Sequence, residues 1–150
     1  MPSALDSYAE YARLIFFLLA DRPTIEHHSL AVYTTSRTIG ITRGEVNFRS
    51  GHVLRVFEQV DFVACRIVKY FYELAYQGES LWWYDSMPHP DVPDLQSAHP
   101  HHKHIPPDIK HHHIPALQLS FTRPNLPTLI EEVERFASDN AQRAQPGQSD

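Results

Sequence analysis

Apolar residues recur every three or four positions between residues 3 and 21, which is the spacing of one face of an α-helix. Ser7-Tyr8-Ala9-Glu10 fits a capping box, and Ser3 is an earlier candidate cap. Pro23 disfavours helical geometry at the residue before it, so the helix should end near Asp21. We expect an amphipathic helix that packs on a sheet through Leu5, Tyr8, Ala12, Ile15, Phe16 and Leu19.

The pattern changes to strand-like alternation between residues 25 and 85. Ser50-Gly51 separates two alternating runs, and Gly78-Glu79 separates a long run from a short one. These short connections, without a helical pattern between them, favour an antiparallel meander. The five expected strands span residues 29–35, 45–49, 52–60, 66–77 and 80–85.

Alternation within these strands places two acids in line with apolar rows. Glu58 shares a strand face with Leu54 and Val56, and Asp85 shares one with Trp83. Buried carboxylates without a partner are rare, so each acid is solvated, paired with a base, or functional. The expected apolar row of the fourth strand comprises Val68, Tyr70, Tyr72, Leu74 and Tyr76.

A second helix is expected to open at Asn125-Leu126-Pro127, because Asn suits the N-cap and Pro is tolerated in the first turn. From Ser138 the chain is polar, which indicates a disordered tail over residues 138–150. We therefore expect one α+β domain over residues 1–137. It should be an antiparallel five-strand meander with the two helices on one face and a long His/Pro-rich loop before the last helix.

Composition limits the partners of this domain. The chain has 150 residues and is 42% hydrophobic, enough for one domain with a real core. Thirteen Lys and Arg residues against 18 Asp and Glu residues give a net charge of −5 with histidine neutral. That balance provides no basic footprint for duplex nucleic acid. The 11 histidines titrate near neutral pH and make the surface charge sensitive to pH.

The cysteine content and the apolar runs indicate a cytoplasmic protein. Cys65 is the single cysteine, which excludes an internal disulfide and suits a reducing compartment, and we expect it to pack within a strand. The longest apolar run, Leu14 to Ala20, has seven residues, whereas a membrane span needs about 20. Asp6 and Glu10 outnumber the one basic residue ahead of this run, Arg13, so the segment lacks the positively charged start of a signal peptide.

The segment from Asp85 to His113 has neither a helical nor a strand period, and it contains eight of the 11 histidines and six of the 12 prolines. A long loop in a compact domain is usually functional or disordered. Two histidines and a carboxylate can supply a general base, a general acid and a positioning group, and Lys103 could stabilise an oxyanion or phosphorane. This set suits RNA cleavage through the 2′-hydroxyl, in which one group takes the hydroxyl proton and another protonates the leaving oxygen.

Two other interpretations of the loop stay open. Its imidazole and carboxylate groups could hold a metal, although no Cys-x-x-Cys or His-Glu-x-x-His spacing supports one, and we predict no cofactor. Alternatively, the histidines and prolines only cap the sheet over Trp82-Trp83-Tyr84. His111-His112-His113 lies at the loop exit, where solvation is expected, and is left out of the predicted site.

Two motifs in the loop resemble the paired signature of TumE-family toxins. Tyr84-Asp85-Ser86-Met87-Pro88-His89 resembles the family's Tyr-Asp-Asn-x-Pro-His, and Pro100-His101-His102-Lys103-His104 resembles Phe-Pro-His-His-Lys-His. Ser86 replaces the usual Asn, and His99 stands where the family tends to have an apolar aromatic residue. The resemblance covers most of residues 5–137, including Leu54-x-Val56-x-Glu58 and the closing helix.

The resemblance implies a growth-inhibiting toxin that a cognate antitoxin neutralises, but it supplies no chemistry. Together with the residue chemistry, it leads us to expect a small ribonuclease-like enzyme that acts on RNA or the ribosome. The alternatives are a non-catalytic toxin that occludes its target and a metal-dependent phosphate or nucleotide enzyme, and oligomerisation stays open. The candidate catalytic residues are Glu58, Asp85, His89, His101, His102 and His104, and the candidate substrate-binding residues are Tyr84, Ser86 and Lys103.

Overall fold

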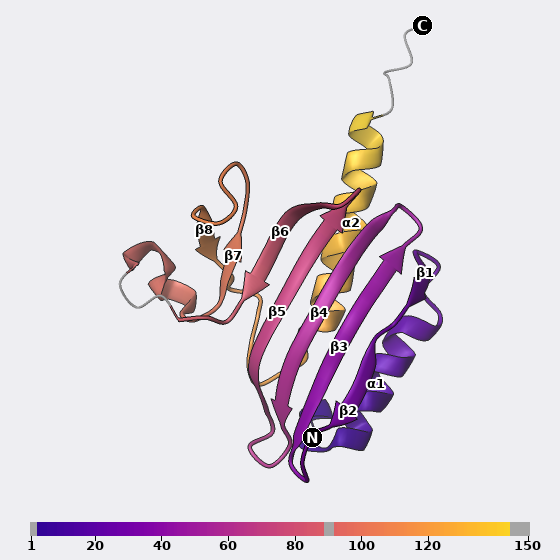
Figure 1. Ribbon diagram of the computed structural model, residues 1–150, viewed down its shortest axis with the longest axis vertical. Helices are drawn as coiled ribbons and strands as arrows, with labels where there is room; N and C mark the ends of the chain where they lie inside the picture. Colours follow the sequence, from indigo (N-terminus) through magenta and orange to yellow (C-terminus); the bar gives the residue numbers. More distant parts are fainter. Residues whose placement is uncertain (1–2, 89–91, 145–150) are drawn as a thin grey trace, which may run out of the picture.

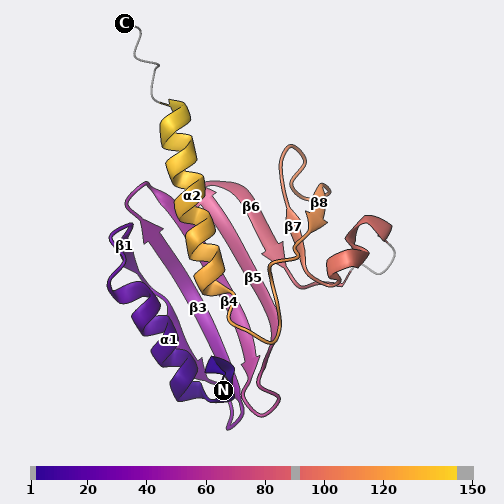
Figure 2. The ribbon, with the colours of Figure 1, turned by 180° about the vertical axis from the view of Figure 1, so that it is seen from behind.

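An antiparallel sheet forms the centre of the structure, a computed structural model that describes residues 3–88 and 92–144. Over these residues the sheet has eight strands, and β3 pairs with both β1 and β2 at one end of the order β1-β3-β4-β5-β6-β7-β8. The helices α1 (Tyr8–Ala20) and α2 (Leu126–Ala144) cover one face (Figures 1 and 2). The strands are β1 (Ile25–His28), β2 (Ala31–Thr34), β3 (Ile39–Phe48), β4 (His52–Asp61), β5 (Arg66–Tyr76), β6 (Glu79–Asp85), β7 (His102–His104) and β8 (His113–Pro115).

The α+β class, the antiparallel sheet and the two flanking helices are confirmed, but the count of five strands is wrong. The predicted strand 45–49 is only the second half of β3, and β7 and β8 form within the predicted loop. Gly44 lies within β3. It allows the link between β1 and β2 to pass close to β3, because a Cβ atom at Gly44 would lie 2.5 Å from the carbonyl oxygen of Ser29.

The N-terminal helix is divided in two. Ser3 caps a short 3-10 helix, η1 (Ala4–Asp6), and the Ser7 hydroxyl accepts a hydrogen bond from the backbone N–H of Glu10 at the start of α1. The buried residues of α1 are Tyr11, Ile15 and Leu19, whereas the predicted Tyr8 and Phe16 are exposed. The buried row is therefore one in which Tyr11 replaces Tyr8.

The C-terminal helix is longer than predicted. Residues 138–144 belong to α2, which buries Leu129, Ile130 and Val133 against the sheet. Arg143 lies in the last turn, where a positive charge is favourable for the helix dipole. Residues 145–150, the rest of the predicted tail, lie outside the described residues. Neither α-helix combines the length and apolar character needed to cross a bilayer in the part of the chain that is described.

Two register shifts decide which side chains face the helices. Between the β4–β5 pairs Gln59–Lys69 and Val60–Ile67, β5 carries one extra residue, Val68, so Ile67 is buried and Val68 is exposed. A second shift adds Leu81 to β6. As a result Trp82 and Tyr84 are buried on the helix side, while Trp83 and Asp85 face the other side.

The turn between β4 and β5 contains Cys65, which has a left-handed backbone with φ of 56°. The prediction that Cys65 packs within a strand is therefore wrong. Asp61 stabilises this turn by accepting hydrogen bonds from the backbone N–H groups of Val63 and Ala64.

Candidate functional site

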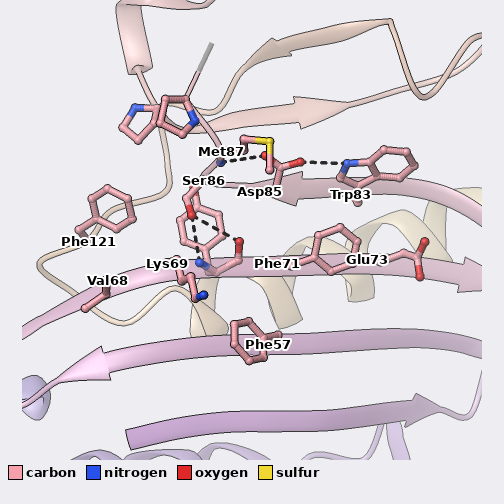
Figure 3. Close-up of a pocket in the computed structure, with 13 residues that line it drawn as sticks. Phe57, Val68, Lys69, Phe71, Glu73, Trp83, Asp85, Ser86, Met87 and Phe121 are labelled. Atoms are coloured by element: carbon pink, nitrogen blue, oxygen red, sulfur yellow. Dashed lines mark hydrogen bonds between the residues drawn. The ribbon is translucent and has the colours of Figure 1, made fainter. Parts of the chain in front are cut away.

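An aromatic pocket of about 960 Å³ lies on the open face, the face of the sheet opposite α1 and α2 (Figure 3). Phe57, Phe71 and Trp83 line it from the neighbouring strands β4, β5 and β6. Phe71 is exposed, and its ring centroid lies 6.3 Å from that of Trp83. This pocket was not predicted from the sequence, although the alternation of Phe57 against the buried Val56 and Glu58 was a signal for it.

Positive charges lie along the edge of this pocket despite the negative net charge of the chain. The Arg43 guanidinium is 5.1 Å from the centre of the Phe57 ring, and the Lys69 ammonium is 5.9 Å from the same ring. Arg66 lies 5.1 Å from the ring centre of Phe121, a second lining residue. These are cation–π distances, so the pocket combines flat apolar surfaces with local positive charge.

Asp85 lines the pocket at the end of β6 and contacts two histidines of β7. The Nε2 atom of His102 lies 2.8 Å from Asp85 Oδ1, and the Nε2 atom of His104 lies 3.3 Å from Oδ2. Both histidines are buried, whereas the Asp85 side chain is 19% exposed. The antiparallel pairing of Asp85 with His102 thus joins the two sequence motifs in one cluster.

Hydrogen bonds to the backbone fix the orientation of both imidazole rings. The Nδ1 atom of His102 lies 2.9 Å from the carbonyl oxygen of Pro100, and that of His104 lies 2.8 Å from the carbonyl oxygen of Ile109. A carbonyl oxygen can only accept, so each Nδ1 carries a hydrogen. Both Nε2 atoms are thereby directed toward Asp85.

The carboxylate of Asp85 is positioned by its own neighbours. The backbone N–H of Met87 donates to Oδ1 at 3.0 Å, and the indole N–H of Trp83 donates to Oδ2 at 3.2 Å (Figure 3). The Trp83 ring also stacks on His104, with 4.4 Å between ring centroids. Trp83 therefore connects the cluster to the aromatic pocket.

The charges of the cluster shift its pKa values in opposite directions. Burial alone would raise the pKa of Asp85, but the hydrogen bond and charge of His102 and the N–H of Met87 hold it below its ordinary value. Burial alone would lower the pKa of His102, but the hydrogen bonds to Asp85 and to the Pro100 carbonyl raise it. Burial, with the nearby charges of His102 and His99, lowers the pKa of His101.

His113 was left out of the predicted site, yet β8 places it beside the cluster. Its ring centroid lies 5.7 Å from that of His102 and 5.2 Å from that of His104. His111 and His112 are exposed, as predicted for the triplet. His113 differs from His111 and His112 because it pairs with His104 in the β7–β8 ladder, and no local sequence signal marks that pairing.

Lys103 and Tyr84 lie on the helix side of the sheet, away from Asp85. The Lys103 ammonium is 2.8 Å from Glu132 Oε1 on α2, and the Tyr84 hydroxyl donates to the same carboxylate at 2.8 Å. Side chains alternate along β7, so Lys103 faces opposite to His102 and His104. These two predicted substrate-binding residues attach α2 to the sheet.

Glu58 is also on the helix side, where it is fully buried. The hydroxyls of Tyr11 and Tyr72 donate to its two carboxylate oxygens, Tyr72 at 2.5 Å. Burial raises the pKa of Glu58, although these hydrogen bonds oppose the shift. The sheet separates Glu58 from Asp85, so these two candidate catalytic carboxylates lie on opposite faces and do not share one site.

The remaining candidates lie around the Tyr70 end of the pocket. The Ser86 hydroxyl accepts from the backbone N–H of Tyr70 at 3.0 Å and ties the end of β6 to β5 (Figure 3). The Nδ1 atom of His101 lies 2.5 Å from the Tyr70 hydroxyl, and the two rings are stacked. His101 is half-buried and is not part of the cluster that Asp85 forms with His102 and His104. His89 lies outside the described residues.

Comparison with known proteins identifies the family. A family model described as Toxin TumE matches residues 15–137, which include the aromatic pocket and both loop motifs. No curated protein and no solved structure matches the chain. A toxin of this kind has a cognate antitoxin as its partner. The chain therefore belongs to the TumE toxin family, and it is the toxin component of a toxin–antitoxin system.

Proposed function

We propose that this toxin acts on RNA as a small ribonuclease-like enzyme, with Asp85, His102 and His104 at its catalytic centre. The observation that carries the proposal is the position of this cluster. It lies at the end of an open aromatic pocket, and its carboxylate is part of the pocket lining. Functional groups beside a pocket on a rigid sheet are the usual architecture of an enzyme site.

The pocket favours an unpaired RNA segment as the substrate. Phe57, Phe71 and Trp83 offer ring faces on which successive bases can stack, the mode by which sheet surfaces bind single strands. Arg43 and Lys69 lie at the edge, within reach of backbone phosphates. The net charge of −5 disfavours tight nonspecific binding to duplexes, so we expect a short single-stranded site, free or on the ribosome.

The reaction that suits these groups is cleavage of a phosphodiester bond. Attack by the 2′-hydroxyl requires removal of the hydroxyl proton and protonation of the leaving 5′ oxygen. Asp85 and the two imidazoles can support these transfers directly or through a bound ion. For His101 and Ser86 we propose roles in substrate binding near the pocket, and for Glu58, Tyr84 and Lys103 we propose roles in holding the sheet and helices together. His89 stays a candidate acid, base or substrate-binding group from its motif alone.

This function is tested by inducing the toxin without its antitoxin and measuring growth and RNA integrity. Asp85→Asn keeps the shape of the side chain and removes its charge, and Asp108→Asn is the matched control in an exposed position of the same loop. We expect the wild type and Asp108→Asn to arrest growth and fragment RNA, whereas Asp85→Asn does neither. Growth arrest by Asp85→Asn with intact RNA would reject the enzyme and support a toxin that occludes its target.

A further inference from the structure

We propose that Asp85, His102 and His104 bind a divalent first-row transition metal ion. The proposal names the cofactor of the catalytic centre, and only the catalytic meaning of the ion rests on the proposed function. Binding itself follows from the geometry of the three side chains. His102 and His104 are buried, and the partly exposed Asp85 lines the aromatic pocket.

The donor atoms are close enough for one ion. One carboxylate oxygen and one ring nitrogen from each histidine all lie within 4.8 Å of one another. The two contacts between nitrogen and carboxylate measure 2.8 and 3.3 Å. A four-coordinate ion with bonds of about 2.1 Å separates neighbouring ligand atoms by about 3.4 Å. Small side-chain movements would therefore place the three atoms around an ion.

The backbone around the histidines is arranged as it is in metal sites. A histidine that ligates a metal through one nitrogen almost always donates a hydrogen bond from the other, often to a backbone carbonyl. His102 does so to Pro100, and His104 does so to Ile109. The two rings reach the same carboxylate from strand positions two residues apart. This paired arrangement presents both Nε2 atoms to one point.

The two imidazole rings also lie close to each other. Their centroids are 5.0 Å apart, and both Nε2 atoms contact the carboxylate of Asp85. A single divalent ion can bind two imidazole nitrogens and one carboxylate oxygen at the same time.

The ligand chemistry selects the class of metal. Two imidazole nitrogens and one carboxylate suit zinc, manganese, iron(II) or cobalt, whereas magnesium and calcium prefer oxygen ligands. Trp83 and Met87 donate hydrogen bonds that hold the Asp85 carboxylate in place. Three protein ligands leave a coordination position for water or a phosphate oxygen, and Asp85 faces the pocket from which these would enter.

Titration with Co²⁺ tests the site. The full-length, untagged protein is stripped with a chelator, and Co²⁺ binding is followed by its visible absorption and by competition with Zn²⁺. The test variant is Asp85→Asn. The matched control is the double variant His111→Ala/His112→Ala, which removes the exposed imidazoles most able to bind metal nonspecifically. We expect one ion per chain in the wild type and the control, and affinity lowered by more than about 100-fold in Asp85→Asn.

Two results would overturn the proposal: no stoichiometric binding by the wild type, or binding lost in the double variant and kept in Asp85→Asn. Circular dichroism establishes that each variant is folded, and His104→Gln repeats the test at a second ligand. The metal site and the ribonuclease can fail separately. Metal binding without RNA cleavage rejects only the ribonuclease, and cleavage that requires Asp85 but persists in chelator rejects only the metal.

Discussion

Replacing Glu58 distinguishes a structural carboxyl group from a catalytic one. The side chain is fully buried on the helix side and accepts hydrogen bonds from Tyr11 of α1 and Tyr72 of β5. It therefore connects a helix to the sheet. We predict that Glu58→Ala strongly destabilises the protein, whereas Glu58→Gln keeps the fold and the toxicity.

The magnitude follows from the groups that Glu58→Ala would leave behind. The hydroxyls of Tyr11 and Tyr72 would lose their acceptors inside the core, at a cost of about 1–3 kcal/mol each. The removed side-chain atoms would also leave a cavity. A total of about 3–6 kcal/mol is a large part of the roughly 5–15 kcal/mol that stabilises a typical domain. Glu58→Gln keeps the volume and one acceptor oxygen, so it should cost about 1–2 kcal/mol.

The stability difference between the wild type and Glu58→Gln should depend on pH. Burial raises the pKa of Glu58 in the folded protein, so the folded state holds its proton at pH values where the unfolded state has lost it. The contribution of Glu58 to the free energy of unfolding is therefore greatest below the ordinary carboxyl value of 4.5 and is lost as the pH rises from there through the raised folded pKa. Glu58→Gln has no such proton, so the difference between wild type and variant should decrease over that window.

Urea denaturation from pH 4 to 8, followed by tryptophan fluorescence, measures these differences, with growth arrest measured in parallel. The chain has two tryptophans, Trp82 and Trp83, and both lie in β6 within the sheet. A stability difference that does not change with pH would refute the buried, proton-holding carboxyl group. A folded Glu58→Gln protein without toxicity would show that Glu58 takes part in the activity.

Three further changes test other parts of the structure. Phe71→Ala should weaken binding of a labelled single-stranded RNA by about 1–3 kcal/mol in fluorescence anisotropy. Phe16→Ala, at an exposed position on α1, is the control and should not weaken binding. Equal effects of the two variants would refute stacking in the pocket. Lys103→Met should lower thermal stability through its lost contact with α2 but leave Co²⁺ binding unchanged, and lost binding would count against the separation of the two faces. Burial alone would raise the pKa of Glu134, but its hydrogen bonds to Arg22 hold the pKa below its ordinary value, so this pair stabilises the fold above that ordinary value and the contribution is lost as the pH falls. Arg22→Gln should reduce that acid sensitivity by no more than about 1 kcal/mol in urea denaturation. An unchanged pH profile would contradict the pairing.

The class of the fold could be predicted because its signals are local. Ser50-Gly51 and the alternating runs beside it specify the β3–β4 hairpin, and Ser7 specifies the start of α1. The faces of the later strands could not be predicted in the same way. The extra residues Val68 and Leu81 each reverse the alternation, and a repeat of two residues does not show where a bulge falls.

The candidate site was predictable in its residue types but not in its grouping. The two motifs contain Asp85, His102 and His104, yet their contact depends on the register between β6 and β7. Lys103 belongs to the same motif and faces the other way because strand side chains alternate. His113 joins the cluster through β8, whose pairing has no signal in the nearby sequence.

Incubation of the purified toxin with RNA tests the central claim most directly. The antitoxin is removed, a transition metal is supplied, and the new RNA ends are mapped by sequencing for the wild type, Asp85→Asn and Asp108→Asn. We predict new ends within single-stranded segments for the wild type and Asp108→Asn, and none for folded Asp85→Asn. Intact RNA with the wild type, or equal cleavage by Asp85→Asn, would contradict a catalytic centre at Asp85, His102 and His104.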